Sequence, residues 1–495
     1  MKSPLFLALD IGTSSVRAAL YDCRAEVLPE TMVKNERAVE ITDDGGAEID
    51  ANQAFAQVVA AIDDVFAKCP REIEQIQFAA ASCFWHSLLG IDDKGEPTTP
   101  VYTWAETRPA KYVQRLRDGL DETSIHNRTG ARFHSSYWTA KLLWLHHEKP
   151  AEFEKTAKWI SFSDFAAAKL FAFQTAENKV RTSVSMASGT GIFDVRNCVW
   201  DTELLDYLNI REENLPEIIE KDDRTFELNA EYSNRWANLR GSKWFHAIGD
   251  GAANNIGANC VKKEKAALMI GTSGAMRVAY EGDVPKNIPS GLWCYRIDRK
   301  RVILGGALSD GGGLYRWLKD NFRLKKNDDK TEAKIEKRAP DAHGITFLPF
   351  LAGERSTGYH EAASGAILGL RSAHDKIDIV QAALESVAYR FAEIFDQLSE
   401  VLEIKEIIAS GGALRESPVW TQMICDVLAR NMNLPDTREA SSRGAVLLAS
   451  ETAGIIKGIS EMETPEGVRF KFDGEKHQIY QTARDRHRRF YEILI

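Results

Sequence analysis

Residues 7–20 read LALDIGTSSVRAAL, and this stretch indicates the fold of the whole chain. It consists of an apolar run, a short polar turn and a second apolar run. Two β-rich runs joined by a short turn predict a β-hairpin. Gly12 has no Cβ, so a ligand can approach the backbone of the turn closely. The stretch therefore predicts a hairpin whose turn faces a ligand.

The polar residues of this turn are of the kinds that bind phosphate and a cation. Thr13 and Ser14 offer hydroxyl and N–H groups, which suit phosphate oxygens. Asp10 ends the first run, so its carboxylate is expected near the same place. Because hard oxygen ligands suit Mg²⁺, a carboxylate beside bound phosphates predicts a magnesium ion between them. On this stretch alone, an ordinary hairpin turn remains an alternative.

A second stretch repeats this plan about half a chain later. Residues 267–279 read ALMIGTSGAMRVA, in which residues 270–273 match residues 11–14. Repetition on the scale of a domain indicates a duplication, so we predict two similar domains that present their turns to a shared cleft. Where the first copy has Asp10, the second has Met269. The cation is therefore expected on the first copy only.

Length and composition are those of a globular protein with several domains. The chain has 495 residues, of which 44% are apolar and 27% charged, and this length suits two or three domains. The net charge of -9 argues against a nucleic-acid-binding protein, which normally carries a basic excess. The seven cysteines form no Cys-x-x-Cys pair, so we expect no zinc site, no disulfide framework and a reducing cytoplasm.

The N-terminus and the apolar runs indicate no membrane partner. The first apolar run is short and is broken by Asp10, which is typical of a first strand and not of a signal peptide. No apolar run approaches the roughly 18 residues that a membrane span needs.

Polar residues follow two predicted strands in the first half. His86 comes after the apolar strand at 76–82, and Glu106 and Arg108 come after the strand at 101–104. Ligands of open α/β sheets bind at the carboxyl ends of the strands, so these side chains are expected to form a polar substrate pocket. A structural histidine, and a surface ion pair or helix-terminal charge, remain the alternatives.

Asp250 is the candidate catalytic residue. An apolar strand ends at residues 249–251, Gly-Asp-Gly, and a helix of small residues follows. The flanking glycines are expected to leave the carboxylate uncovered and to let a substrate come close. The alternative is that Asp250 only caps the helix, a position for which Asp is favoured.

Two glycine-rich junctions join a strand to a helix in the second half, within residues 305–313 and 407–414. Unpaired N–H groups and the helix dipole bind anions at the start of a helix, which favours phosphate binding at the first junction. The second junction suits a nucleotide base or ribose. The candidate ligands are Gly311, Gly312, Gly411, Gly412 and Ala413.

With these motifs in this order, the chain resembles the FGGY carbohydrate kinases over nearly its whole length. The matching residues are 10–15, 104–108, 249–251, 271–274 and 410–413. Within the family it is most similar to gluconokinases, and these similarities lie at residues 85–87, 104–108, 128–130, 270–277 and 351–355. Two departures concern the sugar: Glu106 stands where the family commonly has Asp, and residues 356–360 replace an aromatic-Asn segment.

The resemblance implies an α/β protein with the two-domain, actin-like (ribonuclease H-like) ATPase fold and an active site in the cleft between the domains. The expected domains are residues 1–242, which bind the sugar, and 243–495, which bind the nucleotide. ATP and Mg²⁺ are the expected cofactors, with Asp250 as catalytic base and Asp10 as metal ligand. The expected substrate-binding residues are His86, Glu106, Arg108 and Asp250. The expected nucleotide-binding residues are Gly12, Thr13, Ser14, Gly271, Thr272, Gly311, Gly312, Gly411, Gly412 and Ala413.

The expected activity is phosphorylation of the terminal hydroxyl of D-gluconate. A sugar acid needs donors for its carboxylate, and the candidates are Arg108, Arg132, His134 and Lys141. Because Glu106 would oppose a carboxylate unless it binds hydroxyls elsewhere, xylulose, ribulose or another polyol remains an alternative.

Two other functional classes share these motifs. An actin- or chaperone-like ATPase would keep the phosphate turns but gives no reason for the polar residues after the strands. An inactive sugar-binding regulator would not need Asp10 and Asp250. We expect a small-molecule partner and no nucleic acid or membrane, and we leave a homodimer open.

Overall fold

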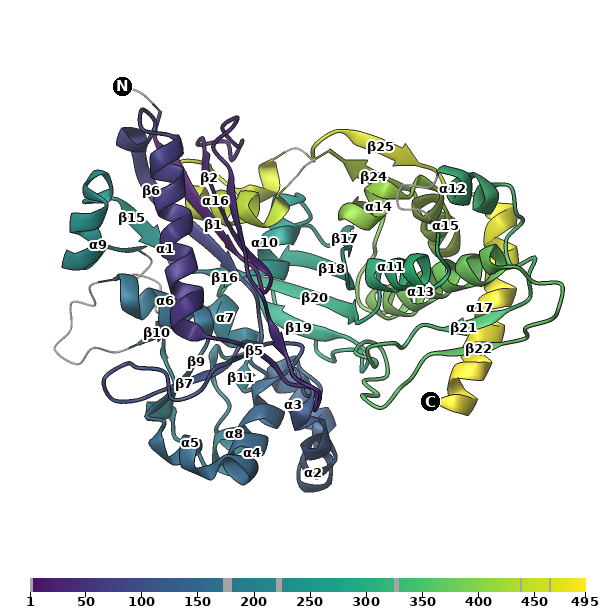
Figure 1. Cartoon of the computed structure of the whole chain (residues 1–495), viewed down its shortest axis with the longest axis horizontal. Helices are drawn as coiled ribbons and strands as arrows, with labels where there is room; N and C mark the ends of the chain where they lie inside the picture. Colours follow the sequence, from purple (N-terminus) through teal and green to yellow (C-terminus); the bar gives the residue numbers. More distant parts are fainter. Residues whose placement is uncertain (1–2, 172–179, 220–224, 325–328, 437–438, 463) are drawn as a thin grey trace.

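The computed structural model describes residues 3–171, 180–219, 225–324, 329–436, 439–462 and 464–495. Within them the chain forms two halves that lie side by side, each built around a seven-stranded sheet (Figure 1). The two-domain α/β architecture that the duplicated hairpin predicts is therefore confirmed.

The first sheet is built on the first predicted hairpin. β1 (Leu5–Ile11) and β2 (Ser15–Tyr21) pair antiparallel, and β6 (Ile76–Cys83) pairs parallel with β1. The other strands of this sheet are β3 (Val33–Glu36), β14 (Thr225–Phe226), β15 (Lys243–Phe245) and β16 (Ile248–Gly249). β3 pairs antiparallel with β2, whereas β15 and β16 both pair parallel with β6.

The second sheet repeats this order of strands. β17 (Lys265–Ile270) and β18 (Gly274–Glu281) form the second predicted hairpin, and β23 (Glu406–Ser410) pairs parallel with β17. The other strands are β19 (Trp293–Arg296), β20 (Arg301–Leu308), β24 (Met432–Pro435) and β25 (Gly467–Phe470). The path β20-β18-β17-β23-β24 thus matches β3-β2-β1-β6-β15, in directions as well as in order, as a duplication requires.

The first sheet continues past residue 242, where we predicted the boundary between the domains. β15 and β16 belong to it, although they follow that boundary. α10 (Asp250–Gly257) comes directly after β16 and packs against α16 (Ala440–Thr452), which also packs on β1 and β6. A segment near the end of the chain therefore returns to the first half, an exchange that a linear division of the sequence does not reveal.

Helices cover both sheets, and their starts have local causes. α1 (Ala51–Lys68) begins where the Asp50 carboxylate accepts a hydrogen bond from the Gln53 N–H. α13 (Lys376–Ser399) begins at a capping box that Asp375 and Asp378 form.

Further helices and several small sheets complete the two halves. The remaining helices are α2 (Val113–Gly119), α3 (Glu122–Thr129), α4 (Trp138–Glu148), α5 (Pro150–Lys155), α6 (Phe162–Leu170), α7 (Val184–Ser188), α8 (Thr202–Tyr207), α9 (Ala230–Arg235), α11 (Gly312–Asn321), α12 (Asp329–Glu336), α14 (Gly412–Glu416), α15 (Pro418–Leu428) and α17 (Gly474–Leu494). The small sheets use β4 (Glu40–Ile41), β5 (Ala47–Ile49), β7 (Leu89–Ile91), β8 (Val101–Tyr102), β9 (Lys158–Ile160), β10 (Arg181–Thr182), β11 (Phe193–Asp194), β12 (Val199–Trp200), β13 (Glu217–Ile218), β21 (Thr346–Leu348) and β22 (Ala366–Leu368). Among the described helices, none has both the length and the apolar character of a membrane span.

Candidate active site

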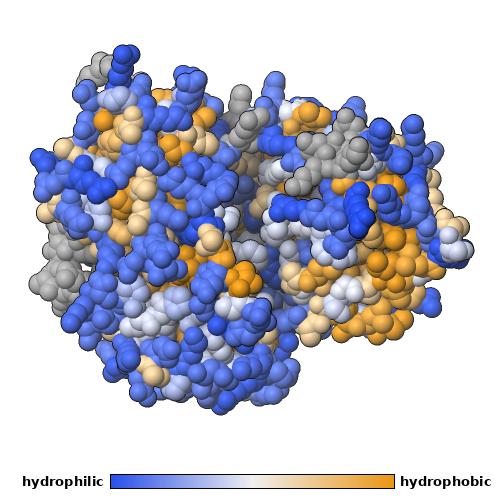
Figure 2. Space-filling model, viewed as in Figure 1, coloured by the Kyte–Doolittle hydropathy of each residue, from blue (hydrophilic) through white to orange (hydrophobic). Residues whose placement is uncertain are grey.

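The surface is hollowed between the two halves (Figure 2), and residues of both halves line a cavity of about 200 Å³. Its charged and imidazole side chains are His86, His134, Asp250, Arg277 and Arg355. Aromatic rings form much of the remaining wall, namely Trp85, Trp104, Tyr137, Trp293, Tyr295 and Tyr359. Met269, Ser273 and Gly274 bring the second hairpin turn to the same cavity.

Parallel strands bring three predicted residues to one edge of the first sheet. β1, β6 and β16 run parallel, so their carboxyl ends meet there. Asp10 lies near the end of β1, and Asp250 follows directly after β16. His86 lies three residues beyond the end of β6. Ligands of open α/β sheets bind at this edge.

The Asp10 carboxylate is nearly buried and already accepts two hydrogen bonds. Ser82 Oγ donates to it at 2.6 Å and Arg17 Nη1 at 3.1 Å. Arg17 Nε also lies 3.5 Å from a carboxylate oxygen of Glu439, directly before α16. Each of the two bonds uses a different oxygen of Asp10, and a carboxylate oxygen has more than one lone pair, so the group keeps capacity for a cation.

Asp250 is half-buried and lies near charges of both signs. Its Oδ1 accepts a hydrogen bond from the Gly251 N–H at 2.8 Å. Burial raises the pKa of the Asp250 carboxyl above that of an ordinary Asp; Arg277 opposes this rise and Asp10 adds to it. A carboxylate with a raised pKa in a cleft has the properties of a general base.

The glycines beside Asp250 make room for an indole ring. A Cβ on Gly249 would lie 1.8 Å from Trp85 Cε2, and a Cβ on Gly251 would lie 2.6 Å from Trp85 Cζ3. Trp85 Nε1 donates to the Ser185 carbonyl at 2.9 Å, which holds the ring in place. We expected these glycines to admit the substrate; in the structure they let Trp85 lie against the backbone that carries Asp250.

We expect Gly249→Ala to lower both stability and kcat/KM, because its methyl group cannot fit unless Trp85 or β16 moves. Overpacking of this kind costs roughly 1–3 kcal/mol. Thermal unfolding and a kinase assay would measure both effects. Gly474→Ala is the matched control, since a Cβ there meets no atom within 4 Å. A Gly249→Ala protein with the melting temperature and activity of the parent would contradict the packing role.

The first hairpin turn uses one of its N–H groups internally and leaves hydroxyls available. The Gly12 N–H donates to the Ser15 carbonyl at 2.9 Å. Thr13 Oγ1 accepts a hydrogen bond from Trp104 Nε1 at 3.2 Å, which ties the turn to the cavity wall, and Ser14 is exposed. Phosphate binding by Thr13 and Ser14 therefore stays a prediction that this geometry permits.

The second hairpin turn is open around Gly271 and Thr272. The Gly271 N–H donates to the Ser273 carbonyl at 2.9 Å, and Thr272 is exposed. A Cβ on Gly271 would meet only Met269 Sδ, at 3.8 Å. A phosphate group has room to approach this backbone.

The N–H groups at the start of α11 are not free, which contradicts the prediction of an anion site from unpaired donors at Gly311 and Gly312. Gly311 and Gly313 donate to the Thr272 carbonyl at 3.1 and 2.8 Å, and Gly312 donates to the Gly271 carbonyl at 2.9 Å. These donors hold the second turn against α11. A contact between segments so far apart in sequence was not visible in the motif.

In the second glycine-rich junction, Gly411 is required for close packing, whereas the backbone at Gly412 is open to its surroundings. Gly411 has φ +102°, and a Cβ there would lie 2.2 Å from the Ile270 carbonyl oxygen, so close packing requires this glycine. Gly412 is exposed, and a Cβ there would meet no atom within 4 Å. Ala413 packs toward Gly312, since a Cβ on Gly312 would lie 2.9 Å from its methyl group. Gly412 is therefore the member whose backbone is open to a nucleotide.

His86 lines the cavity as a neutral ring in a left-handed backbone conformation, with φ +66°. Lys141 was predicted to donate a hydrogen bond to the carboxylate of the sugar acid. Its Nζ instead donates to the backbone carbonyl oxygens of His86 and Thr103, both at 2.7 Å. Burial lowers the pKa of His86 to about 3. Its Nδ1 lies 2.5 Å from the Gly189 carbonyl and so carries the proton, which leaves Nε2 as an acceptor for a sugar hydroxyl.

Glu106 and Arg108 do not line the cavity, contrary to the expectation that they bind substrate. Glu106 is fully buried and accepts hydrogen bonds from Arg108 Nε and Nη2, both at 2.7 Å, and from the Ala47 N–H at 3.1 Å. Arg108 also pairs with Glu48. A buried charge needs such partners. The ion pair between Glu106 and Arg108, which the sequence analysis gave as an alternative, is thus present. It is buried, however, and its role is structural.

Of the four predicted carboxylate donors, His134 alone lines the cavity, and it is uncharged. Burial lowers its pKa to about 3, and its Nδ1 accepts a hydrogen bond from the Ser136 N–H at 3.1 Å. Arg132 lies outside, with Nε 2.8 Å from Glu122 and Nη1 donating to the Ser290 carbonyl at 2.9 Å. The predicted cations therefore serve other partners.

Two arginines that were not predicted as ligands line the cavity instead. Arg277 is 8% exposed and has two buried nitrogens without a hydrogen-bond partner; burial lowers its pKa to about 10, against the effect of Asp250. Arg355 donates from Nη2 to the Leu308 carbonyl at 3.0 Å, and its guanidinium lies 5.1 Å from the centre of the Trp104 ring. The sequence does carry a signal for Arg277, because it is a charged residue within an otherwise apolar predicted strand.

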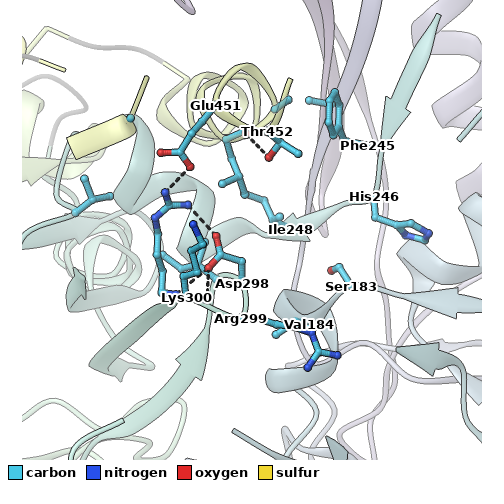
Figure 3. A pocket seen from close by; sticks show the side chains of 18 of the residues that line it. Ser183, Val184, Phe245, His246, Ile248, Asp298, Arg299, Lys300, Glu451 and Thr452 are labelled. Carbon is cyan, nitrogen blue, oxygen red and sulfur yellow. Dashed lines mark hydrogen bonds and ion pairs between the residues drawn. The ribbon is translucent and has the colours of Figure 1, made fainter. Parts of the chain in front are cut away.

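A larger cavity, of about 580 Å³, lies between α16 and the turn from β19 to β20 (Figure 3). Arg301 in its wall lies 2.8 Å from Asp298 and also pairs with Glu451. Among the described residues that line it, none is a predicted site residue. The chemistry-bearing residues therefore point to the smaller cavity.

One cluster with metal-ligand chemistry lies elsewhere in the second half, formed by Asp341, His343 and Glu385. Its groups are already partnered. Arg486 Nη1 donates to Asp341 at 2.8 Å, and Glu385 accepts hydrogen bonds from His343 and Tyr389, both at 3.2 Å. This cluster is a structural network that connects α13 and α17.

The chain matches two domains of one protein family. The N-terminal domain of the FGGY family of carbohydrate kinases matches residues 5–257, and its C-terminal domain matches residues 266–453. The chain is 27% identical over 478 residues to the gluconokinase of Bacillus subtilis (strain 168), covering 94% of this chain and 91% of that protein. It is 24% identical over 472 residues to the xylulose kinase of Lactococcus lactis subsp. lactis (strain IL1403), covering 94% and 91%.

Solved structures of a gluconate kinase and of a xylulose kinase are also similar to this chain. The gluconate kinase from Lactobacillus acidophilus superposes with a TM-score of 0.89 at 25% identity, covering 100% of this chain and 98% of that one. The xylulose kinase from the same organism superposes with a TM-score of 0.90 at 26% identity, covering 99% and 98%. With duplicated sheets, paired hairpin turns and a half-buried Asp at their cleft, this chain belongs to the FGGY family of carbohydrate kinases.

Proposed function

We propose that this carbohydrate kinase transfers the γ-phosphoryl group of ATP to the terminal hydroxyl of D-gluconate, giving 6-phosphogluconate. The observation that carries the proposal is the charge of the cavity. Asp250 is the one acid among its described lining residues, and it shares the cavity with the guanidinium groups of Arg277 and Arg355. An excess of positive charge in a buried cavity favours an anionic acceptor.

The family alone leaves the sugar open, because gluconokinases and xylulose kinases are similar to this chain to nearly the same degree. The burial of Glu106 removes the main objection to a sugar acid. Its carboxylate is held by Arg108 and Ala47, outside the cavity, so it does not repel an acid there.

The residues of the cavity fit the acceptor side of a phosphoryl transfer, which needs positioning and charge neutralisation more than covalent help. Asp250 takes the proton of the attacking hydroxyl. His86 Nε2 accepts a hydrogen bond from another hydroxyl and so helps to fix the chain of the sugar. Aromatic side chains such as Trp85 and Tyr295 exclude water from the acceptor.

The donor side fits ATP and Mg²⁺. The nearly buried Asp10 carboxylate would hold the cation, and Thr13, Ser14 and Thr272 would contact the β- and γ-phosphates. Gly412 would border the adenosine, because its surroundings are open. When bound, Mg²⁺ supplies neutralisation of the charge on the phosphates.

A side-by-side assay of ADP release tests the proposal. We expect the kcat/KM for D-gluconate to exceed those for D-xylulose, D-ribulose and glycerol by at least about tenfold, since one charged hydrogen bond contributes roughly 1.5–3 kcal/mol. Phosphorus NMR of the product should place the phosphate on the terminal carbon. A higher kcat/KM for a neutral acceptor would overturn the substrate and leave the family membership standing. ADP release at the same rate without acceptor would favour the actin-like ATPase.

A further inference from the structure

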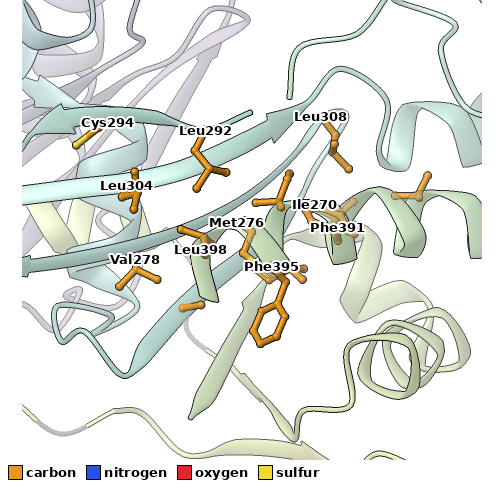
Figure 4. Close-up of a cluster of buried hydrophobic side chains, with 14 of the residues drawn as sticks. Ile270, Met276, Val278, Leu292, Cys294, Leu304, Leu308, Phe391, Phe395 and Leu398 are labelled. Carbon is orange, nitrogen blue, oxygen red and sulfur yellow. The ribbon is translucent and has the colours of Figure 1, made fainter. Parts of the chain in front are cut away.

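β18 aims one charged side chain at the cavity. Successive residues of a strand face opposite sides. Met276 and Val278 face the core under α13, where Phe391 and Phe395 also lie (Figure 4). Residues 275 and 277 therefore face the other side of the sheet, and both line the cavity. β18 lies between β20 and β17, so a strand inside the sheet sets the position of the Arg277 backbone.

The Arg277 guanidinium has unused hydrogen-bonding capacity. The side chain is 8% exposed, and neither Nε nor Nη1 has a hydrogen-bond partner among the described residues. Asp250 is the charged group that acts on it most strongly, yet it takes no hydrogen bond from these two nitrogens. Leaving a buried donor unpaired is costly, and a bound anion would relieve that cost.

We infer that Arg277 binds the carboxylate of the acceptor and thereby selects sugar acids over neutral sugars, an assignment that rests on the proposed function. The planar guanidinium matches a carboxylate with two parallel hydrogen bonds. The carboxylate of the sugar acid then lies at Arg277, while the hydroxyl at the other end of its chain reaches Asp250. Arg355 is less suited, because it already donates to the Leu308 carbonyl and stacks over Trp104.

The position of Arg277 along β18 indicates that its side chain reaches the acceptor and not the phosphates that the hairpin turn would bind. The second hairpin turn ends at Gly274, where β18 begins. Arg277 is three residues further along. At the usual rise of a strand, this places its Cα roughly 10 Å from the end of the turn. The acceptor end of the cavity is therefore the part that its side chain reaches.

Paired acceptors and three variants test the inference. D-Gluconate is compared with D-glucitol, which has the same carbon chain with a hydroxymethyl group in place of the carboxylate, and with D-xylulose. At a pH above the acid side of the pH profile, we expect Arg277→Met to lower kcat/KM for D-gluconate roughly 10- to 100-fold and to lower kcat/KM for the two neutral acceptors far less. Arg277→Lys should recover part of the selectivity, because it restores the charge without the fork.

Calorimetry supplies a readout besides activity. Arg277→Met should weaken D-gluconate binding in the absence of nucleotide and leave the affinity for ATP unchanged. Arg296→Gln is the matched control, because it removes a second buried guanidinium of the same sheet whose Nε donates to the Val195 carbonyl at 2.7 Å, away from the cavity. Melting temperatures show which variants fold, and Arg277→Lys retains the test if Arg277→Met does not.

The outcomes separate the inference from the proposed function. If the parent phosphorylates D-gluconate and the Arg277 variants lose activity equally with charged and neutral acceptors, Arg277 acts on the phosphoryl group or on Asp250 and the inference fails. The same holds if selectivity for D-gluconate does not change. If the parent neither binds nor phosphorylates D-gluconate, the proposed function itself fails.

Discussion

Asp250→Asn should keep the fold and the affinity for ATP and lower turnover by roughly a hundredfold or more, which is the scale of a lost general base. Asn has the same shape as Asp, and its Oδ1 can still accept the hydrogen bond from the Gly251 N–H. The amide cannot take a proton from the attacking hydroxyl. Initial rates with D-gluconate and nucleotide binding by calorimetry measure the two properties. Turnover close to that of the parent would show that another group is the base.

The pH dependence of the parent should report the same carboxylate. Asp250 must be ionised to accept a proton, so kcat/KM falls as the pH drops through its pKa. Because burial raises that pKa above the ordinary 3.8, the fall should begin at a higher pH than an exposed Asp would give. Arg277→Met removes the positive charge that opposes the rise, so the fall should move to still higher pH, measured with a neutral acceptor. A profile that does not move would show that Arg277 and Asp250 are uncoupled.

The parts of the fold that were predicted from sequence are those with local signals. The two hairpins were readable because each consists of two apolar runs around a turn, and their repetition predicted two similar domains. The structure adds that the two sheets share one strand order. The rule that ligands bind beyond the carboxyl ends of strands was applied to His86, Glu106 and Arg108, and of these three only His86 lines the cavity. The return of α16 to the first sheet has no local signal, which explains why a boundary at residue 242 did not describe the packing.

The errors at the site come from contacts between distant segments. A strand-end position does not say which way a side chain turns, and Glu106 turns to Ala47 and Arg108 instead of to the cavity. Likewise, the start of α11 would bind an anion if its N–H groups were free, but these groups donate hydrogen bonds to the carbonyl oxygens of Gly271 and Thr272. Arg277 was within reach of sequence reasoning, because alternation along β18 places it on the side opposite Met276 and Val278.

Asp10→Ala should lower turnover by roughly a hundredfold or more, the scale on which one electrostatic stabiliser of a transition state acts. It should also raise the Mg²⁺ concentration needed for half-maximal activity. No carboxylate can replace Asp10 from the second hairpin, where Met269 stands at the equivalent position. Mg²⁺ titrations at saturating ATP and D-gluconate measure this effect, and the stabilisation of the protein by Mg²⁺ and ADP on heating gives a second readout. Asp22→Asn is the control, because it changes an Asp beyond the far end of the same hairpin that only accepts turn N–H groups.

An unchanged Mg²⁺ titration in Asp10→Ala would place the cation elsewhere. The variant also has a signature that simple loss of metal does not produce. The charge of Asp10 adds to the raised pKa of Asp250, whereas Arg277 lowers that pKa. Removing Asp10 should therefore move the acid side of the pH profile to lower pH, and removing Arg277 should move it to higher pH. Opposite shifts from two substitutions on different halves of the molecule would identify Asp250 as the titrating group that both charges act upon.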